Sequence, residues 1–133
     1  MTRVQCTFAI GLLTALLAAP AWTELLPVQT HGNVSYVSGG VGDEEMTALK
    51  SMQKSYNLHL LFVDRDGHYL SGTQVAVKNA RGETVLDARS NGPYFYANLP
   101  TGRYSVSASN DGRTQTRLLQ VGTKGGKQTT FRW

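Results

Sequence analysis

Hydrophobic and polar residues alternate along most of the chain after Leu58, which is the pattern of β-strands that bury one face. In the first of these segments Leu58, Leu60 and Phe62 share one side, because successive side chains in a strand point in opposite directions. Turn signals separate the segments, and the clearest hairpin turn is at residues 110–112. The pattern predicts a mainly β fold, a single antiparallel seven-stranded β-sandwich over residues 57–133, with strands near residues 58–63, 74–78, 83–88, 94–97, 103–108, 114–121 and 128–132.

One segment ahead of the predicted sandwich has a helical period instead. Its apolar side chains recur at intervals of three and four residues: Met46, Leu49, Met52 and Tyr56. This spacing predicts one N-terminal amphipathic helix over residues 43–56, with Asp43 as its N-cap. A short strand at residues 33–38 and a glycine-rich turn at 39–42 precede it. The apolar stripe either covers the sandwich, the interpretation we favour, or docks a partner with the glycine-rich turn as a hinge.

Residues 1–21 have the three parts of a cleavable signal peptide. Arg3 supplies the positive charge, residues 8–19 form the apolar region, and small residues at 19 and 21 give the cleavage pattern. We therefore expect export, either to the periplasm or out of the cell. The mature chain would begin at Trp22 and would have no membrane segment after cleavage.

Cysteine content and charge narrow the classes of partner. The only cysteine, Cys6, lies inside the signal, so disulfides and thiolate metal sites are not expected in the mature chain. Without Arg3, twelve basic and nine acidic side chains remain, and the basic ones are too scattered to predict a nucleic-acid partner. Residues 113–132 contain no acid and are the one segment suited to an anionic partner. Residues 22–32 show no period and are expected to be a flexible leader.

Aromatic residues gather in one predicted strand and indicate a candidate binding surface. Tyr94 and Tyr96 would lie on one face of this strand and Phe95 on the other. If Phe95 is in the core, the two tyrosines are exposed and can stack on a sugar or peptide. If the tyrosines are in the core, Phe95 is the exposed ring. The candidate surface for a partner or ligand is therefore Tyr94 and Tyr96 with Arg103 and Arg117, although packing is the commoner use of such rings.

The residues just after this strand have the pattern of a tyrosine corner. A leucine, a Pro-x-Gly turn and then a tyrosine at a strand start form this motif, in which the phenol bonds nearby backbone. Leu99, Gly102 and Tyr104 occupy these positions. We therefore assign structural roles to all three.

We expect no catalytic residue, bound metal or cofactor. His59 and His68 flank a predicted hairpin, but two imidazoles alone make a weak metal site, and both are expected at the surface. Asp64 and Asp66 would begin a calcium loop, yet its twelfth position is Val75 rather than the bidentate glutamate. We interpret this segment as a turn.

Two stretches resemble one known family. The stretch "LHLLFVDRDGHYLSGTQVAV" at residues 58–77 has a strand, an Asp-x-x-Gly turn and a Val-x-Val strand, and "GPYFYANLPTGRYSVSAS" at 92–109 contains Leu-Pro-x-Gly-x-Tyr-x-Val. Both are similar to the carboxypeptidase-regulatory-like domains of the transthyretin-like (prealbumin-like) β-sandwich fold. With the added leader and helix, the chain resembles small exported proteobacterial proteins of unassigned function. The resemblance implies an Ig-like sandwich and a periplasmic location, but no chemistry.

One enzyme, 5-hydroxyisourate hydrolase, shares that fold. It uses a first-strand histidine and a C-terminal Tyr-Arg-Gly-Ser, whereas His59 is out of register and this chain ends Thr-Phe-Arg-Trp. The hydrolase is therefore a minor alternative. We predict a non-enzymatic exported module without a cofactor that binds a protein, peptide or glycan of the cell envelope. The alternative is a structural or assembly accessory domain without a small ligand, and the oligomeric state stays open.

Overall fold

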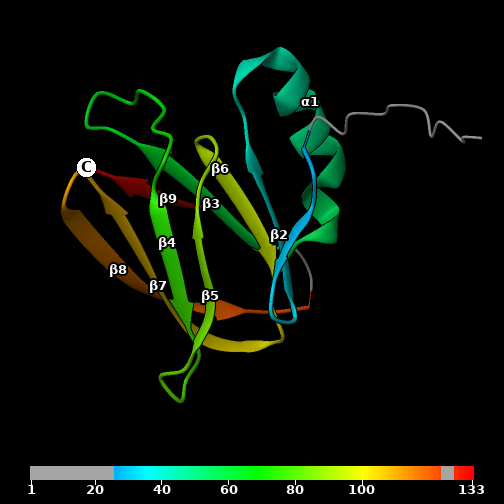
Figure 1. Cartoon of the computed structure of the whole chain (residues 1–133), viewed down its shortest axis with the longest axis vertical. Coiled ribbons are helices and arrows are strands. Elements are labelled where there is room, and N and C mark those ends of the chain that lie inside the picture. The colour runs from blue at the N-terminus through cyan, green and yellow to red at the C-terminus, as the bar shows by residue number, and fades with distance from the viewer. Residues whose placement is uncertain (1–25, 124–127) are drawn as a thin grey trace, which may run out of the picture.

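The computed structural model describes residues 26–123 and 128–133, which contain nine strands, one α-helix and one short 3-10 helix (Figure 1). In chain order these elements are β1 (Gln29–His31), β2 (Val34–Gly39), α1 (Gly42–Met52), the 3-10 helix η1 (Gln53–Ser55), β3 (Leu58–Val63), β4 (Gln74–Lys78), β5 (Thr84–Arg89), β6 (Tyr94–Asn98), β7 (Gly102–Asn110), β8 (Arg113–Val121) and β9 (Gln128–Arg132). Their order shows a mainly β protein, as the alternating pattern predicts.

The strands form two sheets that pack as a sandwich. One sheet has five strands in the order β1-β2-β6-β3-β9, and the other has four in the order β5-β4-β7-β8. The described strand pairs are antiparallel, with one exception: β9 runs parallel to β3, with Phe131 opposite Phe62. The expectation of a wholly antiparallel sandwich was therefore wrong. After β8 the chain crosses to the other sheet instead of making a hairpin, and it enters beside β3 in the same direction.

The strand count also differs from the expected seven. Strands β3 to β9 lie close to the predicted positions, but β2 pairs with β6 and β1 pairs with β2, so both extend the sandwich itself. Residues 29–31, expected in a flexible leader, form β1 instead. The alternation there was too short to recognise, and the pairing with β2 orders it.

The core between the sheets is built from the inward positions of both. Phe62, Phe95 and Phe131 come from the five-stranded sheet, and Val77 and Val106 face them from the four-stranded sheet. All five side chains are fully buried. Close packing of such side chains, rather than a cross-link, stabilises the sandwich.

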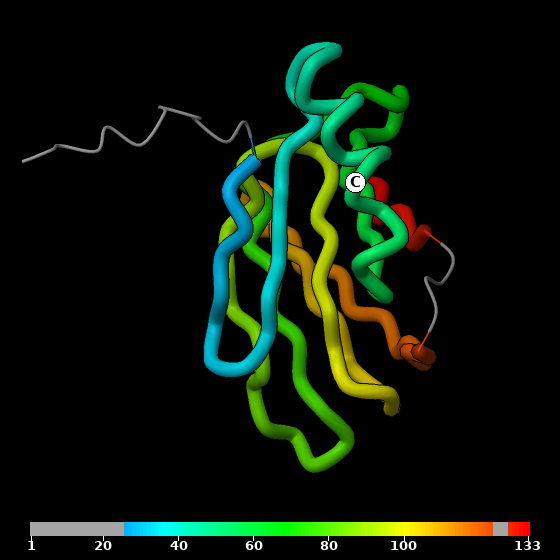
Figure 2. Tube along the Cα trace, turned by 90° about the vertical axis from the view of Figure 1, so that its right-hand side faces the viewer, coloured from blue at the N-terminus to red at the C-terminus, as the bar shows by residue number. Residues whose placement is uncertain are grey.

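A second apolar layer lies on the outer face of the five-stranded sheet, under α1. Leu49, only 1% exposed, packs with Val37, Tyr56 and Tyr96, and partly buried Met46 and other side chains close the edges. Figure 2 shows this helix beside β2 and β6. The interpretation that the stripe covers the sandwich agrees with this packing, and the helix follows two strands rather than leading the fold.

The helix ends differ from the sequence prediction. The N-cap is Val41 rather than Asp43, which lies in the first turn, and no side chain caps it in the usual way. Instead Glu45 Oε1 accepts hydrogen bonds from the backbone N–H groups of Gly40 and Val41, both at 3.0 Å. The α-helix ends at Met52 but continues as the 3-10 helix η1 to Ser55, and the chain becomes extended at Tyr56, the last residue of the predicted helix.

The predicted signal peptide, residues 1–21, and the first residues of the predicted leader lie outside the described residues. Among the residues that are described, no helix has the length and apolar content needed to cross a membrane.

Candidate binding surface

The two tyrosines expected to form a stacking platform lie under the helix. Alternation along β6 places Phe95 in the sandwich core and Tyr94 and Tyr96 on the outer face of the five-stranded sheet. Tyr96 is 4% exposed, and its ring lies 6.4 Å from that of Tyr56. From the sequence we expected one face of this strand to be buried and the other to be exposed. The helix covers the second face, so Tyr96 is not available for stacking on a ligand.

Tyr94 lies at the rim of this covered layer. Its ring meets that of the exposed Tyr69 edge-on, with 5.9 Å between centroids. Burial, followed by the hydrogen bond and charge of Tyr69 and the charge of Tyr96, raises the pKa of Tyr94 to about 12. The raised pKa reflects the packing of the Tyr94 ring against the rings of Tyr69 and Tyr96.

His59 is buried, so its predicted surface position was wrong. It is 3% exposed, its Nε2 lies 3.0 Å from the Gln53 carbonyl oxygen, and its ring is 4.6 Å from that of Tyr96. The polar residue occupies a covered position because η1 and Tyr96 enclose the start of β3. His59 and His68 do not act together, since His68 is exposed and pairs with Asp64.

The turn after β3 binds its own backbone. Asp64 Oδ1 accepts hydrogen bonds from the N–H groups of Asp66 and His68, both at 2.8 Å, and Oδ2 lies 3.1 Å from His68 Nδ1. These contacts, with the His68 backbone hydrogen bond the largest, lower the pKa of Asp64. Ligand atoms of the three side chains lie within 4.8 Å of one another. Because Asp64 is already used by the turn, and Val75 at the twelfth position is in the core, the turn interpretation stands.

The residues assigned structural roles gather at the end of β6. The Tyr104 hydroxyl donates a 2.6 Å hydrogen bond to the Pro100 carbonyl, which is the contact expected of a tyrosine corner. Leu99 is buried in the core beside it, and Gly102 lies against the Tyr104 ring.

Sequence reasoning missed the residue that ties this corner to the rest of the fold. Asn57 Nδ2 donates to the carbonyls of Leu99 and Gly122 at 2.7 and 3.0 Å, and Asn57 Oδ1 accepts from Leu99 N–H at 2.8 Å. An asparagine after a helical segment indicates only a helix end, so its partners far along the chain could not be predicted.

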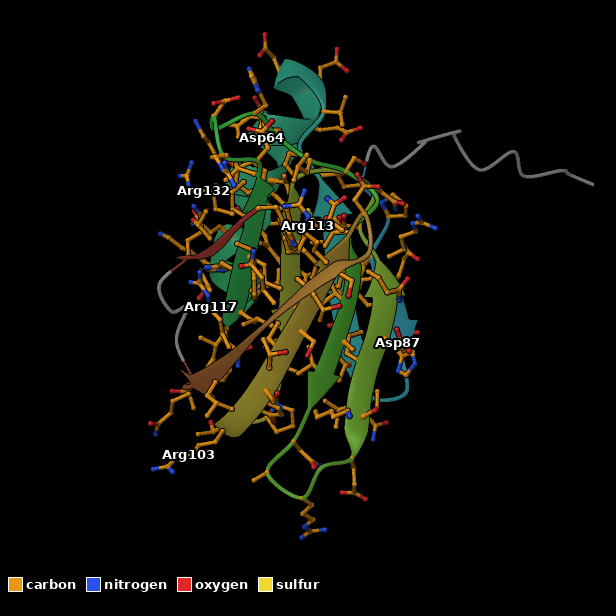
Figure 3. All side chains as sticks on the ribbon, turned by 90° about the vertical axis from the view of Figure 1, so that its left-hand side faces the viewer. Asp64, Asp87, Arg103, Arg113, Arg117 and Arg132 are labelled. Atoms are coloured by element: carbon orange, nitrogen blue, oxygen red, sulfur yellow. The ribbon has the colours of Figure 1, made fainter. Side chains whose placement is uncertain are left out.

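Arg103 and Arg117 lie on the four-stranded sheet, so the structure does not bring them together with Tyr94 and Tyr96. Both arginines are exposed but face opposite sides of their sheet, since Arg103 pairs with Gln120 and Arg117 with the buried Val106. The Arg117 guanidinium lies 5.0 Å above the Phe131 ring. In Figure 3, Arg103, Arg117 and Arg132 lie toward one side of the molecule and Asp87 toward the other.

The most accessible feature near these arginines is the edge of the four-stranded sheet. β8 pairs with β7 alone among the described strands. Its hairpin turn has positive φ at Asp111 (56°) and Gly112 (77°), which is a two-residue type I′ turn. In such a hairpin the backbone N–H and C=O groups of Arg113, and of every second residue after it, hydrogen-bond to β7. The backbone N–H and C=O groups that point along the open edge are therefore those of Thr114, Thr116, Leu118 and Gln120.

An apolar residue stands out on this edge. Leu118 is 84% exposed, whereas its neighbour Leu119 packs against the core. Leu118 also lines a hollow of about 450 Å³, together with Arg103 and Gln120 on the same face. Two consecutive leucines in an alternating strand were the signal in the sequence, because one of them had to point outward. We define the open-edge backbone of β8 with Leu118, Arg117 and this hollow as the β8 edge.

No protein-family model matches the chain, and no curated protein matches it in sequence.

Proposed function

We propose that this protein is an exported, periplasmic, non-enzymatic β-sandwich module that binds a protein or peptide, and that the β8 edge is its binding surface. The observation that carries the proposal is the combination of a nine-residue edge strand, a highly exposed leucine and arginines that form no ion pair with any residue of the described part of the chain. The unpaired N–H and C=O groups of an edge strand are a template for another chain, and the inward-pointing Arg117 limits which chains can pair with β8. Recognition by strand addition uses such an edge for affinity and adjacent side chains for specificity.

The position of the histidines supports a binding module over a transthyretin-like hydrolase. Such an enzyme needs its first-strand histidine in an open pocket, whereas His59 is enclosed by η1 and Tyr96. The covered tyrosines also remove the support for a glycan platform on β6. A protein or peptide has backbone groups that can pair with the β8 edge, whereas a sugar does not.

We also propose that the sandwich belongs with the carboxypeptidase-regulatory-like domains of the transthyretin-like fold. Support comes from the Tyr104 corner and from the strand, Asp-x-x-Gly turn and strand between Leu58 and Val77. These features concern the fold alone, so the binding proposal rests on the β8 edge and not on this likeness.

The proposal is tested by capture of partners from periplasmic extract on the mature chain, residues 22–133. Leu118→Asp places a charge on the β8 edge, and Val41→Asp makes the same change at another exposed residue, 62% accessible, beside the helix. We expect a discrete partner that the unmodified chain and Val41→Asp retain and that Leu118→Asp loses. Equal retention by both variants, or no discrete partner, would overturn the proposal.

A further inference from the structure

We infer that the β8 edge accepts an extended acidic segment of a partner protein as an added strand, with an acidic side chain opposite Arg117 and an apolar one opposite Leu118. The inference rests on the proposed function and names the chemistry of its partner. Its basis is the direction in which each backbone group and side chain of β8 points.

The backbone of the edge defines how the added strand would pair. Thr116, Leu118 and Gln120 direct their N–H and C=O groups outward, so an antiparallel segment would form hydrogen-bonded pairs with them. Arg117 bonds β7, so the residue opposite it would form the closer, non-hydrogen-bonded type of pair. Side chains in such a pair lie on the same face, with Cβ atoms about 4.5–5.5 Å apart.

Charge selects an acidic residue at that position. The only ion pair among residues 26–123 and 128–133 joins Asp64 and His68, so the Arg117 guanidinium has no carboxylate there. It lies over the Phe131 ring of β9, which places it between β8 and β9, and at its N-terminal end β8 also contacts β9 through a hydrogen bond from Gln115 Nε2 to the Arg132 carbonyl. No acid occurs from residue 113 to 132. A glutamate or aspartate on the added strand would therefore supply the missing charge.

The next residue of the segment would meet an apolar surface. A side chain opposite Leu118 would point to the outer face of the sheet, where Leu118 and the hollow beside it lie. Arg103 lines the same hollow, so a longer acidic side chain near this end would also meet a positive charge. The expected partner segment has an apolar residue next to an acidic one, within a run of residues that favour strands.

The same charge argues against a second copy of this chain as the occupant. Two copies joined at β8 would bring two sets of uncompensated arginines together. Inward-pointing charges on an edge strand are a known means of preventing self-association. An arginine on the edge strand repels the arginines of an identical edge and attracts the carboxylates of an acidic strand.

The test uses synthetic strand-forming peptides with the mature chain. The first peptide has isoleucine followed by glutamate, flanked by threonine and valine, and the second replaces glutamate with lysine. We expect the glutamate peptide to bind roughly 2–30-fold more tightly, since the favourable pair is replaced by a like-charge pair. Arg117→Glu should reverse this preference, and Lys50→Glu, the same charge change on the exposed face of α1, should leave it unchanged. An unreversed preference would overturn the pairing with Arg117.

A second arm tests strand addition rather than general charge attraction. N-methylation of the peptide at alternate residues removes either the amides that would face β8 or those that would face away. We expect only the first set to abolish binding, and we expect the amides of Thr116, Leu118 and Gln120 to become protected from hydrogen exchange when the peptide binds. Equal effects of both methylation patterns would overturn the strand-addition geometry.

These results separate the two proposals. If an envelope protein is captured through Leu118 but the glutamate and lysine peptides bind equally, the acidic-strand inference fails and the binding function remains. If no envelope protein is captured, the proposed function fails as well. A concentration-dependent dimer that is lost in Leu118→Asp would replace both proposals with self-association.

Discussion

Leu49→Ala tests whether α1 belongs to the folded unit. Leu49 is the fully buried residue of the helix and packs with Val37 and Tyr96 of the sheet and with Tyr56, which follows η1. Truncating a buried leucine destabilises a protein by about 2–5 kcal/mol, depending on how far the neighbours close the cavity. The sheet cannot easily close the cavity, but the partly exposed Met52 side chain on the helix can move into it, because methionine is flexible. We therefore expect the lower half of the range, about 2–3 kcal/mol.

Urea unfolding of the mature chain, followed by far-UV circular dichroism, measures this change. In a thermal unfolding experiment, the same loss of about 2 kcal/mol would lower the melting temperature by roughly 10 °C for a domain of this size. Lys50→Ala, on the exposed face of the same helix, is the matched control and should change stability by less than about 0.5 kcal/mol. A similarly small change for Leu49→Ala, with an unchanged spectrum, would show that the helix does not stabilise the sandwich and is free to dock a partner.

Three further predictions concern the corner, the covered tyrosine and the signal. Tyr104→Phe removes the hydrogen bond to a backbone carbonyl and should destabilise the protein by about 1–3 kcal/mol, and an unchanged melting curve would rule out this role. The free energy of unfolding should fall as pH rises from about 10 toward 12, because in that range the unfolded chain releases the Tyr94 proton and the folded chain keeps it. Tyr94→Phe should make this fall smaller. Mass spectrometry of the natively expressed protein should find Trp22 at the N-terminus, and an intact Met1 on most molecules would contradict export.

The faces of the strands could be predicted where only one of them is buried. In β4 and β7, buried and more exposed residues alternate along the strand, and the sequence shows the same period of two. In β3 nearly every residue is buried, because the sandwich core covers one face and, on the other face, η1 and Tyr96 enclose His59. The sequence of β3 is apolar on both faces, which was a sign of a second covering layer.

The remaining features depend on contacts between segments far apart in the chain. The parallel pairing of β9 with β3 and the addition of β1 and β2 are decided by which sheet edges are open after the rest has folded. The candidate surface was misplaced for the same reason. The sequence left open which face of residues 94–96 is exposed. In the structure Tyr94 and Tyr96 lie in one sheet on the face that the helix covers, and Arg103 and Arg117 lie in the other sheet.

The most direct test of the proposed binding surface is site-specific photo-crosslinking in living cells. A benzophenone amino acid is placed at Leu118 on the open edge of the four-stranded sheet or, as a control, at exposed Asp87 on the opposite edge strand. We predict one discrete crosslinked envelope protein at Leu118, attached through a segment that contains adjacent acidic and apolar residues, and none at Asp87. Crosslinking to the same proteins at both positions, or none at Leu118, would contradict the account.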